Sequence, residues 1–152
     1  MEIRKQFDPA LYKASDAKAK KAMLKWLEPF NFTTVDTTER MGYDVVCKAV
    51  VEKKHLYEVE IKYGWKDEWP DAWKEIRIPH RKRRLIKRWL NSSPDDPFTF
   101  VVFRSDCQKA WHIDANVLLT CDVREFANSK VGRGELFYHI PVEKATLHDM
   151  SC

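Results

Sequence analysis

Apolar residues recur at helical spacing between residues 15 and 28, SDAKAKKAMLKWLE. Ser15 or Asp16 is suited to cap such a helix, and Pro29 is expected to end it. The apolar stripe that would face the core consists of Ala19, Ala22, Met23, Trp26 and Leu27.

The pattern then changes from a helical period to the alternation typical of strands. Residues 30–37, FNFTTVDT, are rich in β-branched and aromatic residues and predict a first strand. Residues 43–51, YDVVCKAVV, and residues 56–63, LYEVEIKY, predict two further strands joined by the turn EKKH. The second and third strands should therefore form an antiparallel hairpin.

Residues 64–78 are rich in tryptophan and acids, and we expect them to be irregular. Trp65, Trp69 and Trp73 are predicted to pack as a local apolar cluster rather than to stack on bases. From Pro79 onward the segment HRKRRLIKRWL predicts a helix, and its apolar residues should face the core while its arginines face outward.

The remaining third of the chain predicts more strands than helices. Residues 98–104, FTFVVFR, form a strong buried-strand pattern, and residues 109–114, KAWHID, a shorter one. Residues 115–128 predict a helix or helical turn, and residues 135–144 a final strand or extended segment. Helix, three strands, helix and two strands indicate an α/β fold with a mixed sheet flanked by helices.

Composition limits the class of protein. A chain of 152 residues with 44% hydrophobic and 12% aromatic residues is expected to form one domain, residues 1–152. No apolar run resembles a signal peptide or a membrane span, so we expect a cytoplasmic protein with no membrane partner. The four cysteines show no C-x-x-C pair, and free, mostly buried thiols are expected.

Basic residues are concentrated in one segment. Between Arg77 and Arg88 the sequence contains seven lysines and arginines and no acid. Such a segment favours a polyanionic partner, because each phosphate contact releases counterions. The alternative is a solvated helix face that binds nothing.

The predicted hairpin brings acids and a lysine into one region. Asp44 lies on its first strand, and Glu60 and Lys62 on its second. A turn centred on Lys54 would pair residue 46 with 62 and place Asp44 on the face of Glu60 and Lys62. A turn centred between Lys53 and Lys54 would place Asp44 on the other face, because a one-residue slip reverses the alternation.

Two carboxylates and a backbone carbonyl offer hard oxygen ligands, which suit Mg²⁺ or Mn²⁺. Such a metal acidifies water and neutralises charge on a phosphate, and a nearby lysine can stabilise the transition state. The chemistry that these residues predict is phosphodiester hydrolysis, with the basic segment holding the polymer. The alternative is that Lys62 only forms a surface salt bridge with Glu60 or Asp44, which would contribute little to stability.

The motifs GYDVV and YEVEIKY resemble the PD-(D/E)XK nuclease superfamily, and the resemblance spans roughly residues 14 to 113. It implies a restriction-endonuclease-like αβββαβ core. It also implies that Asp44 and Glu60 bind the metal with help from the Ile61 carbonyl, and that Lys62 is the catalytic lysine. Tyr43 stands where the family usually has proline.

Several family members add an acid from a helix, for which Asp16 and Glu28 are the helical candidates and Glu39 is a loop candidate. Glu58 is expected to be a solvated strand acid, because the E-x-K spacing selects Glu60. His112 and His139 alternate within apolar strands and are expected to be structural.

The expected function is a Mg²⁺- or Mn²⁺-dependent DNA endonuclease, resembling Holliday-junction-resolvase-like and phage-type enzymes and leaving a 5′-phosphate. We expect the phosphate contacts to come from the basic segment, with Arg81 and Lys82 nearest the site. The DNA-binding residues predicted there are Arg77, Arg81, Lys82, Arg83, Arg84 and Lys87. The alternative is an inactive nuclease fold that binds nucleic acid or protein. A homodimer is expected if the resolvase-like branch applies.

Overall fold

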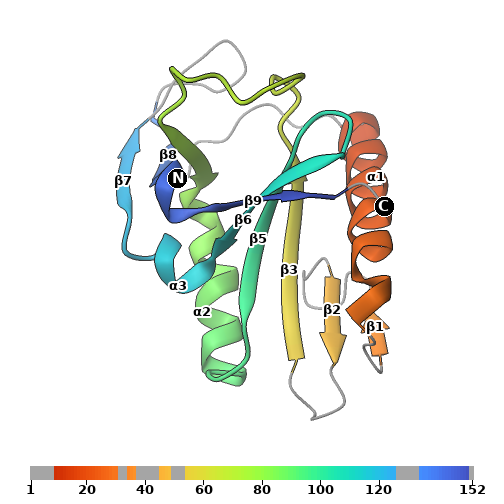
Figure 1. Ribbon diagram of the computed structural model, residues 1–152. Helices are drawn as coiled ribbons and strands as arrows, with labels where there is room; N and C mark the ends of the chain where they lie inside the picture. Colours follow the sequence, from red (N-terminus) through yellow and green to blue (C-terminus); the bar gives the residue numbers. More distant parts are fainter. Residues whose placement is uncertain (1–8, 31–33, 37–44, 49–53, 126–133, 151–152) are drawn as a thin grey trace.

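A computed structural model describes residues 9–30, 34–36, 45–48, 54–125 and 134–150 of the chain (Figure 1). Its first element is helix α1 (Pro9–Leu27), which is followed by the short 3-10 helix η1 (Glu28–Phe30). The helix begins earlier than expected, because proline is well suited to a first helical position. The expectation that Ser15 or Asp16 caps the helix is therefore wrong, since both lie inside it.

Six strands of the described part of the chain form a mixed sheet in the order β1-β2-β3-β5-β6-β9. The neighbours β3 and β5 run parallel, whereas the other neighbouring pairs in this sheet run antiparallel. The strands are β1 (Thr34–Asp36), β2 (Val45–Lys48), β3 (Lys54–Ile61), β5 (Phe98–Phe103), β6 (Lys109–Asp114) and β9 (Thr146–Asp149).

A second, antiparallel sheet has the order β4-β8-β7 within the described residues. Its strands are β4 (Glu75–Pro79), β7 (Asp122–Glu125) and β8 (Leu136–Pro141). The remaining elements are η3 (His80–Lys82), α2 (Arg83–Ser92), α3 (Ala115–Leu118) and η4 (Val142–Lys144). None of the described helices combines the length and the apolar character needed to cross a bilayer.

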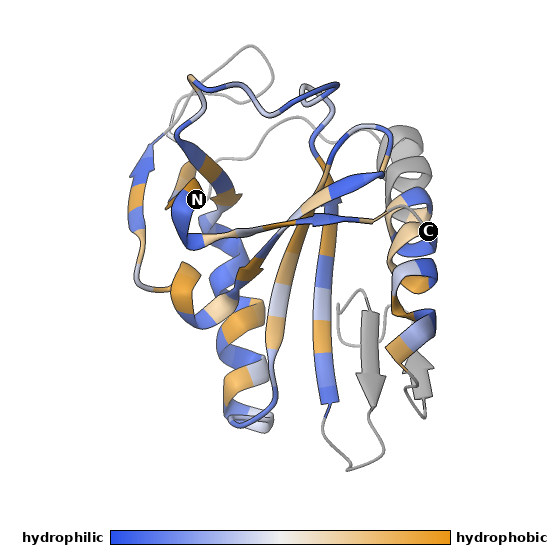
Figure 2. Cartoon of the chain, in the orientation of Figure 1, coloured by the Kyte–Doolittle hydropathy of each residue, from blue (hydrophilic) through white to orange (hydrophobic). Residues whose placement is uncertain are grey.

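The two long helices pack against opposite faces of the mixed sheet. Met23 of α1 is buried with Tyr57 and Val101, whereas Ile86 of α2 is buried with Leu56 and other side chains of the opposite face. The second sheet packs in the same core as α2. Hydrophilic and hydrophobic residues alternate along α2, as expected for a helix with one buried face (Figure 2).

The secondary structure differs from the expectation in three places. Residues 75–79 form β4 instead of an irregular segment, because buried isoleucines alternate there with exposed or half-buried polar residues. The expected helix or helical turn is confirmed as one turn at residues 115–118, whereas residues 122–125 form β7 instead. The C-terminal part adds β9 to the edge of the main sheet, which the sequence pattern did not predict.

The hairpin of β2 and β3 has neither of the two registers expected from the sequence. Val46 pairs with Leu56, and Lys48 with Lys54, so residues 49–53 connect the strands. Even-numbered positions of β2 therefore lie opposite even-numbered positions of β3. The register centred on Lys54 would also have placed even-numbered positions opposite even-numbered ones, but it would have paired residue 46 with 62 instead of 56.

The α/β class and the mixed sheet flanked by helices are confirmed. Helix α1, three strands, helix α2 and strand β5 follow one another as expected, with β4 inserted before α2. The expectation of free thiols is confirmed for the buried Cys107 and the half-buried Cys121. Burial raises the pKa of both thiols.

Candidate active site

Glu60 lies near the C-terminal end of β3, on the face of the sheet that α2 covers. Successive side chains of a strand point to opposite faces, so Glu58 and Glu60 share the face of Leu56. Leu56 is buried in the core that contains α2, whereas the odd-numbered residues of β3 pack with α1. Glu58 is buried and Glu60 is half-buried.

Lys62 follows directly after β3. Its backbone N–H donates a hydrogen bond of 2.9 Å to the carbonyl oxygen of Phe103, which extends the pairing with β5 beyond Ile61. Its Nζ atom lies 5.1 Å from the ring centroid of Trp73, within the range of a cation–π interaction. The structure therefore brings Glu60, the Ile61 backbone and Lys62 to one end of a central strand.

Asp44, the second predicted metal ligand, lies outside the described residues, as does Glu39. Its placement beside Glu60 stays a prediction. Within residues 9–30, 34–36, 45–48, 54–125 and 134–150, no group of three or more His, Cys, Asp or Glu side chains is arranged to hold a metal.

Glu58 is not the solvated strand acid that the sequence suggested. Its side chain is 3% exposed, and its Oε1 atom lies 3.6 Å from Nζ of Lys82 in η3. Lys82 is thus close to the strand that carries the E-x-K triplet, as predicted, but there it contacts a buried carboxylate. The sequence feature that could have indicated the burial of Glu58 is its place in the middle of a strand, on the same face as Leu56.

Arg81, the other residue expected nearest the site, also contacts a buried acid. Its Nη1 atom donates a hydrogen bond of 2.6 Å to Oε1 of Glu135, which is 3% exposed. Glu135 lies 54 residues away in the sequence, and sequence reasoning did not single it out. Residues 81 and 82 therefore connect η3 to two buried carboxylates.

The other predicted DNA-binding residues are exposed. Arg77 alternates with buried isoleucines on β4, and the remaining three lie on the outer side of α2. These three are Arg83, Arg84 and Lys87. The basic segment is thus divided into an inward part in η3 and an outward part on β4 and α2.

Comparisons with known proteins return no match. No protein family profile, no curated protein and no solved structure is significantly similar to the chain.

The predicted tryptophan cluster is confirmed and includes one additional member. The Trp69 ring packs edge-on against Trp65 and Trp73, with centroids 5.1 and 5.0 Å away. It also packs against Trp111 of β6 at 5.6 Å. The cluster thus joins the segment after β3 to β6, and its member Trp73 contacts Lys62.

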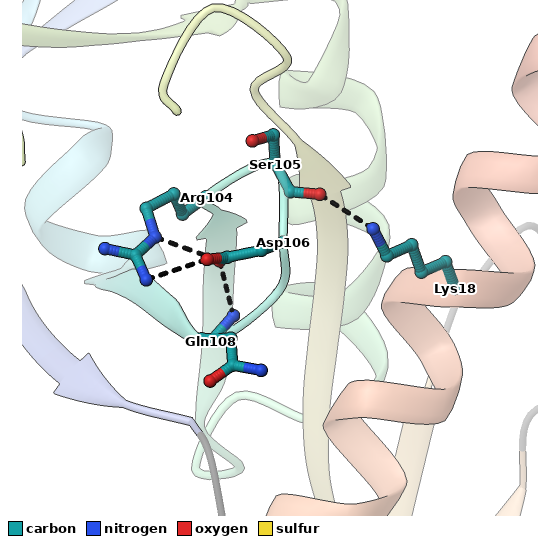
Figure 3. Close-up of polar contacts among 5 residues, drawn as sticks. All are labelled: Lys18, Arg104, Ser105, Asp106 and Gln108. Carbon is teal, nitrogen blue, oxygen red and sulfur yellow. Dashed lines mark hydrogen bonds and ion pairs between the residues drawn. The ribbon is translucent and has the colours of Figure 1, made fainter. Parts of the chain in front are cut away.

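The turn between β5 and β6 lies beside the same end of β3. Asp106 accepts hydrogen bonds from Arg104 Nε and Nη2, at 2.9 and 2.8 Å, and from the Gln108 N–H, at 2.9 Å (Figure 3). The bond from Arg104 is the main reason why the pKa of Asp106 is lowered. Lys18 Nζ of α1 donates a bond of 2.8 Å to the Ser105 carbonyl.

The two strand histidines have contacts typical of structural residues. His112 Nε2 lies 3.4 Å from Met150 Sδ, and its ring packs against His148. Burial, together with the nearby His148 and His55, lowers the pKa of His112 to about 3. His139 is buried with Nε2 3.4 Å from the Arg124 carbonyl, and its Nδ1, which makes no hydrogen bond, lies 3.5 Å from Oε1 of Glu75.

Proposed function

We propose that the chain is a metal-dependent DNA endonuclease of the PD-(D/E)XK type, with Asp44, Glu60 and Lys62 as its catalytic residues. The observation that carries this proposal is the position of Glu60 and Lys62 at one end of β3. This strand runs parallel to β5, and the connection between the two contains the basic helix α2. Apart from β4, which is inserted before α2, the αβββαβ core of that superfamily has the same order of elements, which supports the proposal.

The donor set fits a hard divalent cation. Asp44 and Glu60 would bind it through carboxylate oxygens and Ile61 through its carbonyl oxygen, a combination that suits Mg²⁺ or Mn²⁺. When bound, the cation would acidify water and neutralise charge that develops on the scissile phosphate.

The chain's own side chains would hold and orient the DNA around this point. Lys62 carries its ammonium group at the same end of β3 as Glu60 and would stabilise negative charge on the phosphate. The exposed Arg83, Arg84 and Lys87 would contact the phosphates of the DNA backbone and fix its position without reading its sequence.

Cleavage of supercoiled plasmid, linear duplex, single strands and four-way junctions tests the proposal. Each substrate is incubated with Mg²⁺, Mn²⁺ or EDTA. We expect nicking or cutting with either metal and none with EDTA. Glu60→Gln and Asp44→Asn, which keep the size of each side chain, should each lower the cleavage rate roughly 100-fold or more.

Glu143→Gln is the matched control, because Glu143 is an exposed acid in η4. It should cut like the parent protein. If Glu60→Gln cuts as fast as Glu143→Gln, the assigned site is wrong. If the parent binds DNA but cuts none of the substrates with either metal, the chain is a binding module. Preferential cutting of junctions would indicate resolvase-like activity and a dimer, which sedimentation measures.

A further inference from the structure

We propose that Trp73 is a positioning residue for Lys62. This inference rests on the proposed function. The observation behind it is the contact between Lys62 Nζ and the Trp73 ring, at 5.1 Å from the centroid. Tryptophan is the aromatic side chain that attracts a cation most strongly.

Trp73 is held in place by its own backbone. Its N–H donates a hydrogen bond of 2.9 Å to the Pro70 carbonyl, and its carbonyl accepts one of 2.7 Å from Trp69 Nε1. The edge-on packing of the Trp69 ring restrains the Trp73 ring as well. A ring restrained in this way can fix the position of a flexible lysine side chain.

The beginning of the same segment is anchored to the main sheet. Trp65 is 1% exposed, and its N–H donates a hydrogen bond of 3.1 Å to the Lys62 carbonyl. The Trp65 carbonyl accepts a bond of 2.9 Å from the Ser105 N–H, in the turn shown in Figure 3. Since the Trp65 ring also packs against Trp69, the lysine and the tryptophan that contacts it belong to one unit joined by hydrogen bonds and ring packing.

The aromatic face fixes the place of the ammonium group. The face is electron-rich and attracts a cation. It therefore helps to hold the Lys62 Nζ atom at the end of β3 where Glu60 lies, from which an ammonium group can stabilise negative charge on a phosphate.

Single-turnover cleavage and DNA affinity are measured for the parent, Trp73→Phe and Trp73→Leu, each checked for folding by thermal unfolding. We expect Trp73→Leu to lower the cleavage rate about 5- to 30-fold, with Trp73→Phe between it and the parent. The Kd for a short duplex, measured without catalytic metal, should change less than twofold.

Two further measurements separate positioning from a general structural effect. In a Lys62→Gln background, Trp73→Leu should cause no further loss, because the interaction it removes is already absent. In ¹H–¹³C spectra, the Lys62 ε-methylene protons should be shifted upfield by the Trp73 ring, and Trp73→Leu should abolish the shift. The Lys62→Arg variant identifies the signal.

The failures of the two proposals can be told apart. If the parent cuts DNA and Lys62→Gln impairs cutting, but Trp73→Leu costs nothing or costs the same in both backgrounds, the positioning role is wrong and the nuclease assignment stands. If the parent cuts nothing with either metal, the nuclease assignment fails and the positioning role fails with it.

Discussion

The Glu58 side chain is 3% exposed and lies 3.6 Å from the Lys82 ammonium group, which is one third exposed. A carboxylate at this depth depends on charged or hydrogen-bonding neighbours, because its desolvation is costly. Lys82 therefore contributes to stability, in addition to any contact with DNA.

Replacing Lys82 with methionine tests this contribution. We expect Lys82→Met to lower the free energy of unfolding by about 1–3 kcal/mol, less than for a fully buried pair because Lys82 is partly exposed. Arg84→Met, at an exposed position of α2, should change it by no more than about 0.5 kcal/mol. Chemical denaturation measures both, and equal effects of the two substitutions would show that the contact with Glu58 contributes nothing.

His112 makes stability depend on pH. Its pKa of about 3 in the folded protein lies below the ordinary value of 6.5. Below pH 6.5 the unfolded chain therefore binds a proton that the folded protein does not, and stability falls until about pH 3. In His112→Gln we expect a smaller decrease of the free energy of unfolding between pH 7 and pH 4 than in the parent.

Urea denaturation at several pH values measures this difference. The pKa of His139 is also lowered by burial, but His139 is present in both proteins and its effect cancels in the comparison. Parallel curves for the parent and His112→Gln would contradict the role assigned to His112.

At the level of elements, α2 combines a buried apolar face with an exposed basic one. Each phosphate contact that is lost should make the salt dependence of DNA binding shallower by about 0.9 in log Kd against log salt concentration. Arg84→Gln and Lys87→Gln should therefore weaken binding and lower this slope, singly and together.

Binding of a short duplex in EDTA at several salt concentrations measures the slope. Lys144→Gln in η4 is the control, because it removes an exposed positive charge outside the basic segment. A slope as steep in the α2 variants as in the Lys144→Gln control would exclude this face of α2 from the DNA interface.

The elements that the sequence predicted well have strong patterns, as in the apolar run of β5 and the amphipathic helix α2. The strands that were not predicted have weak hydrophobic patterns. Strand β7 consists of exposed residues, and β9 has no buried residue, so neither shows an apolar period. Strand β4 does alternate, but the pattern is only five residues long and follows a segment rich in tryptophan and proline.

At the level of the whole molecule, local alternation was sufficient to place Glu60 and Lys62 at one end of the same strand. It could not predict the partners of Arg81 and Lys82, because those contacts depend on how η3 packs against β3 and on the arrival of Glu135 from a distant part of the chain. The hairpin register likewise depends on the length of the connection, which alternation does not fix.

Met150 is buried beside α1, and its backbone N–H donates a hydrogen bond of 2.8 Å to the Gln108 carbonyl. During translation, this methionine leaves the ribosome long after the helix whose apolar layer it completes. The apolar layer between α1 and the sheet therefore stays incompletely buried until Met150 has been synthesised. Nascent chains that stall before it would expose this layer to chaperones and proteases.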